Sequence, residues 1–274
     1  MTIIPQALDL TTIKQRQQTM WASGDFGVIA SLIHIVAERL VDSADLVAGS
    51  RVLDVAGGSG NTALAAARCG ADVVSLDYVP SLLERSQRRA QAEGLAYQTV
   101  VGDAEAMPFE DASFDAVVSA VGVMFAPDHA RAAHELLRVC RPGGTIALAS
   151  WAPDSFIGDL FRTTAKHVPP PAGLQPPGLW GTEDHVRSLL GDGVTDLRAE
   201  RLTYTFRYRS PEHFVEIFRE YYGPTHKAFA ALDDAGRDAL AADLTALVAR
   251  TDRLSGEDAI AVPADYLQIV ARRT

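Results

Sequence analysis

Cysteine is scarce in this sequence, and long hydrophobic runs are missing. Cys69 and Cys140 are the only cysteines in 274 residues, too few for a disulfide framework and in no metal-ligand spacing. We expect both to be small buried side chains. No stretch approaches the ~18 apolar residues of a transmembrane helix. The first ten residues contain no Lys or Arg, so we expect no secretory signal and a cytoplasmic protein.

Basic residues are outnumbered by acidic ones. The chain has 25 Lys and Arg against 35 Asp and Glu, which gives a formal net charge of −10. Nucleic acids and anionic membranes both select basic surfaces. The composition therefore argues against either as a partner. With 47% hydrophobic and 22% charged residues, the chain is typical of a globular protein.

Between Arg51 and Trp151, strand-like and helix-like segments alternate. Alternation and β-branched content predict strands at 51–55, 71–77, 96–103, 114–120 and 145–151, and helices at 61–70, 80–94 and 129–140. After Trp151 the alternation weakens, and a further helix is expected at 154–168. Strands joined by helices of this length form right-handed crossovers. The pattern therefore predicts an α/β protein whose parallel sheet carries helices on both faces.

The regions on either side lack this regular alternation of strands and helices. Residues 1–48 are predicted to be an N-terminal helical cap segment, and residues 49–274 one domain with a helical insertion at about 210–256. The individual expectations are helices at 11–20, 28–42, 183–191, 211–223 and 230–252, strands at 197–208 and 261–273, and a proline-rich loop at 169–181. The late strands are expected to complete the same sheet.

A glycine-rich loop follows the first strand of the alternating region, in RVLDVAGGSG (51–60). A loop with few side chains lets a ligand approach the backbone, and the helix that follows favours a negative group at its N-terminus. From Gly58, GSGNTA matches a G-x-G-x-x-A dinucleotide fingerprint, with Asp77 in the position of a ribose-binding acid. Alone, this pattern permits an NAD(P)-dependent oxidoreductase.

Carboxylates at three strand ends point to a different ligand. Asp54 lies inside the strand before the loop, where a pyrophosphate would gain nothing but an ammonium or sulfonium would. Asp77 closes the next strand, where it can accept hydrogen bonds from both ribose hydroxyls. Asp103 closes the third strand, where it can accept from an adenine amino group. The backbone N–H of Ala104 can donate to a ring nitrogen.

Five ordered segments together carry a family resemblance. They are VLDVAGGSGNTALAAA, VVSLDYVPSLLERS, VVGDAEAMPF, SFDAVVSAVGVMF and ELLRVCRPGGTIALASW, within residues 51–151. In these segments the chain resembles a class I S-adenosylmethionine-dependent methyltransferase of the ubiquinone/menaquinone C-methyltransferase-like, type 11 group. The resemblance implies a Rossmann-like, seven-stranded, mostly parallel sheet of order 3-2-1-4-5-7-6, with its last strand antiparallel and a helical cap. It also implies S-adenosyl-L-methionine as the cofactor.

The resemblance assigns roles along the cofactor. Asp54 is expected to hold the amino end, directly or through water, while the glycines admit the methionine part. One departure is Ala56, where the family usually has glycine; its methyl group is tolerable if φ stays negative. Trp21 and Gly24, in WASGDFG, are expected to fold over the cofactor, the alternative being a helix–helix turn with a buried tryptophan. The expected cofactor-binding residues are Asp54, Ala56, Gly57, Gly58, Gly60, Asp77, Tyr78, Asp103, Ala104, Ala120, Trp21 and Gly24.

The sequence gives fewer signals for the residues that would bind the methyl acceptor than for those that would bind the cofactor. Met124 and Phe125 follow the strand predicted at 114–120, and both are expected either to line the acceptor site beside the transferred methyl group or to belong to the core. Phe218 and Tyr222 share a helix face, which either lines the acceptor pocket or is core. His129 and His226 are candidate catalytic residues, and His226 is the candidate base; the alternative for each is a surface histidine at a helix start. We identify no metal constellation.

These observations predict methyl transfer to a small-molecule acceptor by in-line displacement. An acceptor oxygen, nitrogen or carbanion would attack the methyl carbon. Two alternatives stay open: an NAD(P)-dependent oxidoreductase, and a non-methylating protein on the methyltransferase fold. The resemblance also leaves room for a homodimer.

Overall fold

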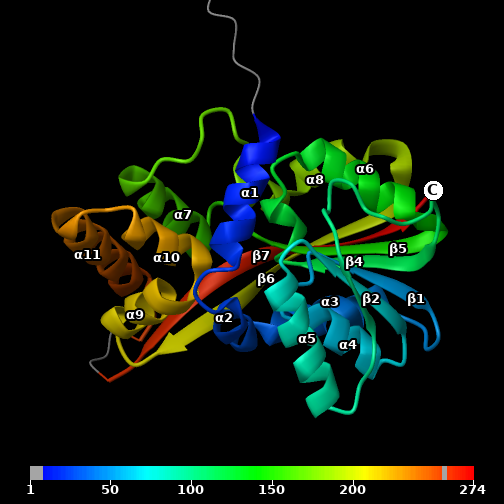
Figure 1. The fold of residues 1–274 in the computed structure, drawn as a ribbon, viewed down its shortest axis with the longest axis horizontal. Coiled ribbons are helices and arrows are strands. Elements are labelled where there is room, and N and C mark those ends of the chain that lie inside the picture. Colours follow the sequence, from blue (N-terminus) through cyan, green and yellow to red (C-terminus); the bar gives the residue numbers. More distant parts are fainter. Residues whose placement is uncertain (1–8, 255–257) are drawn as a thin grey trace, which may run out of the picture.

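A seven-stranded sheet forms the centre of the computed structural model (Figure 1), which describes residues 9–254 and 258–274. Its strand order is β3-β2-β1-β4-β5-β7-β6. Strands β1 to β5 pair in parallel, and β7 is antiparallel to both β5 and β6. The strands are β1 (Arg51–Val55), β2 (Asp72–Asp77), β3 (Gln98–Val101), β4 (Phe114–Ala120), β5 (Cys140–Trp151), β6 (Val194–Tyr208) and β7 (Ile260–Arg273). The expected fold class and strand order are confirmed.

Helices cover both faces of the sheet. In Figure 1, α3, α4 and α5 lie on one face, and α6 and α8 lie on the other. The helices are α1 (Leu10–Trp21), α2 (Phe26–Leu32), α3 (His34–Ala44), α4 (Asn61–Arg68), α5 (Pro80–Ala92), α6 (His129–Val139), α7 (Phe156–His167), α8 (Glu183–Leu190), α9 (Pro211–Tyr221), α10 (Gly223–Ala230) and α11 (Asp234–Thr251), with short 3-10 helices η1 (Val123–Phe125), η2 (Pro177–Gly181) and η3 (Gly191–Gly193).

Strand β1 runs through the core. Val52, Leu53 and Val55 are fully buried, because a central parallel strand is covered by helices on both faces. Asp54 interrupts this apolar run and is itself 0% exposed. Burying a carboxylate in such a position costs folding free energy unless its oxygens are hydrogen-bonded. The partners of Asp54 lie around the neighbouring strand ends.

The N-terminal region differs from the expectation at one point. The helix predicted over 28–42 is broken at Ile33, whose backbone (φ −101°, ψ 14°) separates α2 from α3. Helix α3 then packs against α4 and β5 and covers the sheet. Of the three N-terminal helices, α1 and α2 supply residues to the cavity at the carboxyl ends of the strands, whereas α3 does not.

The described residues between β6 and β7 form three helices instead of the expected two. Gly223 and Pro224 begin α10 instead of a loop. Proline is tolerated in the first turn of a helix because its missing N–H would have no intrahelical partner there. As a result, His226 lies in the first turn of α10, and its N–H donates to the carbonyl of Tyr222 at 2.8 Å.

Two smaller expectations are also corrected. Cys140 is buried as expected, but it begins β5 instead of ending a helix, whereas Cys69 is exposed. Cys69 is the residue directly after α4 and is exposed at the surface. The proline-rich segment 169–181 contains the short helix η2, because Trp180 is buried to 1% exposure and anchors it.

Candidate functional site

A cavity of about 390 Å³ lies between the carboxyl ends of β1 to β4 and helix α1. This size falls within the range of small-molecule sites. Its walls include seven of the residues that the sequence predicted for cofactor binding. These are Trp21, Ala56, Gly58, Asp77, Tyr78, Asp103 and Ala104.

Asp77 connects the glycine loop to the end of β2. Its Oδ2 accepts a hydrogen bond from the N–H of Gly58 at 2.9 Å, and its Oδ1 accepts from the N–H of Val79 at 2.8 Å. Burial raises the pKa of this carboxyl to about 6. Each oxygen retains a lone pair, so the carboxylate can still accept hydrogen bonds from a ligand in the cavity.

Asp54 lies behind the same loop and does not line the cavity itself. Its Oδ2 accepts hydrogen bonds from the N–H of Ala63 at 3.1 Å and the hydroxyl of Ser75 at 3.3 Å. Its Oδ1 is buried and has no hydrogen-bond partner within residues 9–254 and 258–274. Burial raises the pKa of the carboxyl to about 7. The side-chain Oγ of Ser59 is likewise buried and has no hydrogen-bond partner among the described residues.

The loop glycines have different roles. A Cβ at Gly57 would lie 2.2 Å from Oγ of Ser75, and one at Gly60 would lie 2.2 Å from Oγ of Ser86. Neither glycine lines the cavity; both let the loop pack against β2 and α5. Gly58 alone of the three lines the cavity, so it is the glycine that leaves backbone open to a ligand.

Two non-glycine residues at neighbouring strand ends have positive φ. The expectation of a negative φ at Ala56 is wrong, since its φ is 53°. Val121, at the end of β4, has a φ of 55°, which is rare for a β-branched residue. A Cβ at the adjacent Gly122 would lie 2.4 Å from the carbonyl oxygen of Ala56. The ends of β1 and β4 are therefore pressed together, and strain of this kind concentrates at functional sites.

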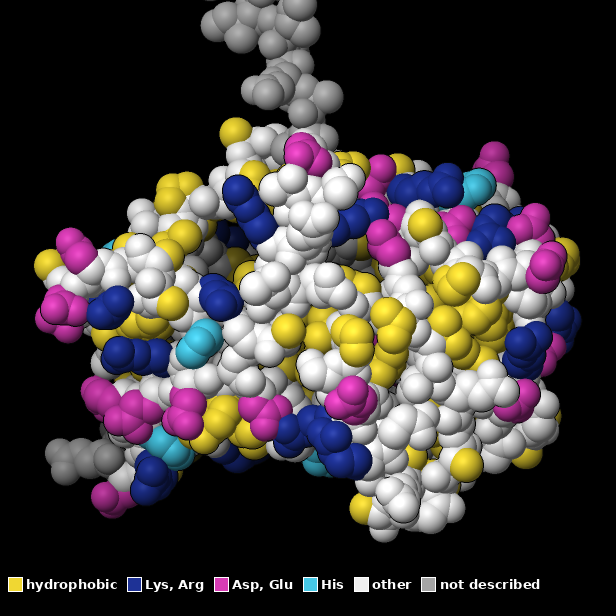
Figure 2. All heavy atoms as spheres, in the orientation of Figure 1, with side chains coloured by type: hydrophobic (Ala, Val, Ile, Leu, Met, Phe, Trp, Pro, Cys, Tyr) yellow, Lys and Arg dark blue, Asp and Glu magenta, His cyan; other side chains and the backbone are white. Residues whose placement is uncertain are grey.

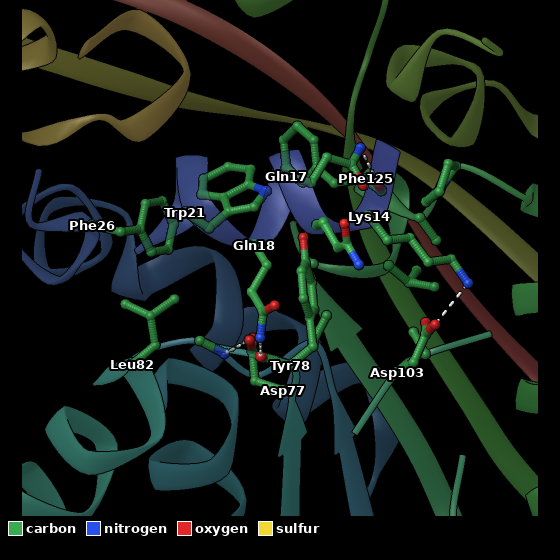
Figure 3. A pocket seen from close by; sticks show the side chains of 18 of the residues that line it. Lys14, Gln17, Gln18, Trp21, Phe26, Asp77, Tyr78, Leu82, Asp103 and Phe125 are labelled. Atoms are coloured by element: carbon green, nitrogen blue, oxygen red, sulfur yellow. Dashed lines mark hydrogen bonds and ion pairs between the residues drawn. The ribbon is translucent and has the colours of Figure 1, made fainter. Parts of the chain in front are cut away.

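Helix α1 contributes polar side chains that the sequence analysis did not identify (Figure 3). Nζ of Lys14 lies 2.6 Å from Oδ2 of Asp103 and also pairs with Glu105. Nε2 of Gln17 donates to the carbonyl of Phe125 at 3.1 Å, and Nε2 of Gln18 donates to the carbonyl of Tyr78 at 2.5 Å. The only sequence signal for this set was their spacing, which places positions 14, 17, 18 and 21 on one helix face.

Aromatic rings form the inner end of the cavity. The ring centroid of Trp21 lies 5.3 Å from that of Phe26, 4.8 Å from that of Phe125 and 5.8 Å from that of Tyr222. Phe125, which the sequence placed with Met124 either at the acceptor site or in the core, lines the cavity. A second, smaller void of about 20 Å³ lies behind these rings, and both Phe218 and Tyr222 line it.

Besides Asp54, Gly57 and Gly60, three further expected residues do not line the cavity. Met124 is 0% exposed and belongs to the core, the alternative that the sequence left open. Ala120 lies one residue before the cavity-lining Val121. Gly24 has a φ of 67° and sits against the backbone carbonyl of Tyr221, so it shapes the turn between α1 and α2.

Neither candidate catalytic histidine lines the cavity. His129 is 1% exposed, so the alternative that it is a surface histidine is wrong. It is buried because its ring packs on Trp180 and its Nδ1 lies 3.0 Å from Nε2 of His185. Burial lowers the pKa of His129 to about 4. His226 lines a separate surface depression beside Arg219, whose carbonyl lies 3.1 Å from its Nδ1.

The charged surface is mixed. Figure 2 shows acidic and basic side chains interspersed over the face that α1 crosses. No helix among residues 9–254 and 258–274 is long and apolar enough to cross a membrane. In the same residues, no three or more His, Cys, Asp or Glu side chains are grouped to hold a metal ion.

Comparison with known proteins bears on this site. A methyltransferase domain family matches residues 53–148, the part that carries the strand ends and the glycine loop. An uncharacterized protein of Mycobacterium tuberculosis is 46% identical over 237 residues, covering 85% of this chain and 86% of that protein. A demethylmenaquinone methyltransferase of Thermus thermophilus is 38% identical over 136 residues, covering 48% of this chain and 62% of that enzyme.

Solved structures show the same fold. The YcgJ protein of Bacillus subtilis superposes with a TM-score of 0.58 at 20% identity, covering 88% of this chain and all of that one. The [4+2]-cyclase SpnF superposes with a TM-score of 0.51 at 21% identity, covering 86% and 81%. The ordered motifs, the strand order and these matches agree: the chain belongs to the class I S-adenosylmethionine-dependent methyltransferases.

Proposed function

We propose that the cavity binds S-adenosylmethionine and that this protein transfers its methyl group to a small-molecule acceptor. The observation that carries the proposal is the buried, unpartnered Oδ1 of Asp54 behind a glycine loop, with Asp77 and Asp103 at the next two strand ends. A buried acceptor without a partner costs about 1–3 kcal/mol. A cationic amino group, bound directly or through water, would remove that cost.

The remaining parts of the cofactor fit the cavity in order. Asp77 has one lone pair free on each oxygen for the ribose hydroxyls. Asp103 and the N–H of Ala104 lie at the end of β3, where they suit the amino group and a ring nitrogen of adenine. Lys14, bound to Asp103 in this structure, covers that end of the cavity from α1.

When bound, S-adenosylmethionine would supply a methyl group activated by its sulfonium, whose carbon would pass in line to the acceptor while the sulfur would leave as the thioether of S-adenosylhomocysteine. The residues of this chain bind and orient the two reactants and exclude water. Holding two reactants in line contributes up to ~7–11 kcal/mol to lowering the barrier. Neither His129 nor His226 lines the cavity. In this proposal the barrier is therefore lowered mainly by aligning the two reactants and by removing water from them.

Two rival functions are weighed against it. An NAD(P)-dependent oxidoreductase would place a pyrophosphate at the glycine loop, where the buried carboxyl of Asp54 would repel it in its ionised form. A protein that uses this fold for chemistry other than methyl transfer is the second candidate, because the [4+2]-cyclase SpnF shares the fold.

Calorimetry with S-adenosylmethionine and with NAD⁺, followed by transfer of a labelled methyl group, separates the three. We expect a Kd near 1 μM for S-adenosylmethionine, about −8 kcal/mol, and no heat with NAD⁺. Binding of NAD⁺ without S-adenosylmethionine would overturn the proposal. Tight S-adenosylmethionine binding without methyl transfer to any acceptor of a broad panel would favour the second candidate.

A further inference from the structure

The ammonium group of Lys14 pairs with two carboxylates that differ in burial. Nζ of Lys14 lies 2.6 Å from Oδ2 of Asp103, whose side chain is 38% exposed (Figure 3). The same Nζ pairs with Oε2 of Glu105, whose side chain is 3% exposed. Lys14 and Asp103 line the cavity, whereas Glu105 does not. Helix α1 is therefore tied both to the wall of the cavity and to a buried carboxylate outside it.

Glu105 is the partner that needs the cation. Among residues 9–254 and 258–274, Lys14 is the only basic side chain that forms an ion pair with Glu105. The other carboxylate oxygen of Glu105, Oε1, accepts a hydrogen bond from the N–H of Asp128 at 2.7 Å. Burial raises the pKa of the Glu105 carboxyl, and a buried carboxylate that loses its cation is strongly destabilised. We therefore expect Lys14 to keep this pair when a ligand binds in the cavity.

Asp103 is the partner that can release the cation. Its Oδ1 accepts a hydrogen bond from the N–H of Glu105 at 2.9 Å, and its Oδ2 is the oxygen that Lys14 occupies. An ion pair as exposed as this one contributes little to stability, because solvent already screens it. The four-carbon stem of lysine is flexible. Nζ can therefore leave Asp103 while it stays at Glu105 and while α1 stays in place.

The proposed cofactor brings a second donor to Asp103. In the proposed function, the amino group of adenine donates a hydrogen bond to this carboxylate, to which Lys14 already donates. An ammonium is a stronger partner of a carboxylate than a neutral amino group is, because opposite charges attract. The amino group can therefore take this oxygen only at the expense of the ion pair, and its net contribution to cofactor affinity depends on Lys14.

We propose that Lys14 is a positioning residue that gives up Oδ2 of Asp103 to the adenine amino group and keeps its pair with Glu105 when the cofactor binds. This inference rests on the proposed function. Before binding, Lys14 neutralises Asp103 at the cavity wall. After binding, the pair with Glu105 still ties α1 to the segment that follows β3. A purine that lacks the amino group leaves Lys14 where it is.

The test compares two ligands on the full chain: S-adenosylhomocysteine and its 6-deamino analogue, in which hydrogen replaces the amino group. Calorimetry gives the two Kd values, and the Kd of the analogue divided by that of S-adenosylhomocysteine measures what the amino group contributes. Any loosening of α1 affects both ligands and cancels in this ratio. Lys14→Met removes the competing cation, so we expect the ratio to rise by about twofold to fivefold. Lys166→Met, at the end of α7, is the control and should leave the ratio unchanged.

Glu105→Gln tests the second half of the exchange. This variant removes the carboxylate that keeps the cation, so Lys14 stays at Asp103 and the ratio should fall below that of the unmodified chain. The double variant with Lys14→Met contains no cation to hold, and its ratio should equal that of Lys14→Met alone. Because the two single variants move the ratio in opposite directions, a general loss of stability cannot produce both results.

An unchanged or lower ratio in Lys14→Met would overturn the exchange, because it would show that Lys14 and the amino group bind Asp103 together. An unchanged or higher ratio in Glu105→Gln would overturn the role of Glu105. Asp103→Ala tests the proposed function separately, since it should bring the ratio to about one. A ratio unaffected by Asp103→Ala would place adenine elsewhere, and no binding of S-adenosylhomocysteine to the unmodified chain would refute the proposed function itself.

Discussion

Nζ of Lys14 lies 2.6 Å from Oδ2 of Asp103, so helix α1 is tied to the end of β3 across the mouth of the cavity. The two side chains are 28% and 38% exposed, and an ion pair of that exposure is worth at most about 1 kcal/mol. Together with the hydrogen bonds of Gln17 and Gln18, it holds α1 in place over the site where we propose that the cofactor binds.

Lys14→Met should therefore loosen α1 without unfolding the protein. We expect the release rate of S-adenosylmethionine to rise by about twofold to fivefold, because the lost ion pair is worth at most about 1 kcal/mol. Stopped-flow displacement measures this rate. Lys166→Met, at the end of α7, is the control and should leave the rate unchanged. Slower release from Lys14→Met would show that the ion pair does not close the cavity.

Asp77→Asn should weaken both the fold and cofactor binding. The carboxylate accepts hydrogen bonds from Gly58 and Val79, and an amide keeps only one acceptor oxygen. We expect a loss of about 1–3 kcal/mol in cofactor affinity and a similar loss in the free energy of unfolding. Calorimetry and urea unfolding measure the two. Asp72→Asn, exposed at the start of the same strand, should change neither; normal cofactor affinity in Asp77→Asn would remove Asp77 as the ribose ligand.

The buried carboxyls predict a pH dependence of the ligand-free protein. Burial raises the pKa of Asp54 to about 7 and that of Asp77 to about 6, from 3.8. The folded state therefore binds more protons than the unfolded state between these limits. The contribution of both groups to the free energy of unfolding is fully present below pH 3.8 and is lost as pH rises through 6 and 7.

Asp54→Asn should remove the part of the pH dependence of the unfolding free energy that comes from Asp54. It should also affect stability and cofactor binding in opposite directions. At pH 8 we expect the ligand-free variant to be more stable by about 1–3 kcal/mol, because no charge is buried, and to bind S-adenosylmethionine more weakly by a similar amount. Urea unfolding at pH 5 and pH 8 gives the first value and calorimetry the second. A variant that is equally destabilised at both pH values would contradict the role given to burial.

His226→Ala tests the base that the sequence suggested. Because His226 lines a surface depression apart from the cavity, we expect turnover to change by less than threefold once an acceptor is known. A fall of ~10²-fold, typical of a lost general base, would show that α10 moves over the acceptor during the reaction. His213→Ala, on the surface of α9, is a matched control.

The sequence determined the sheet, the glycine loop and the acids beside it. Strands of alternating or continuous apolar residues, joined by helices of similar length, leave few topologies open. Because carboxyl ends of parallel strands meet at one edge, Asp77 and Asp103 were expected at a common site, and both line the cavity. These features depend on local pattern and on chain connectivity, which a sequence contains directly.

Tertiary structure alone decided the rest of the site. Lys14 meets Asp103 across 89 residues of chain, and Gln17 meets Phe125 across 108. His129 follows a capping Asp128 as a surface histidine would, yet η2 and α8 bury it with Trp180 and His185. Such contacts form because separate amphipathic elements pack together, and helical periodicity identifies the face that packs without identifying the partner it meets.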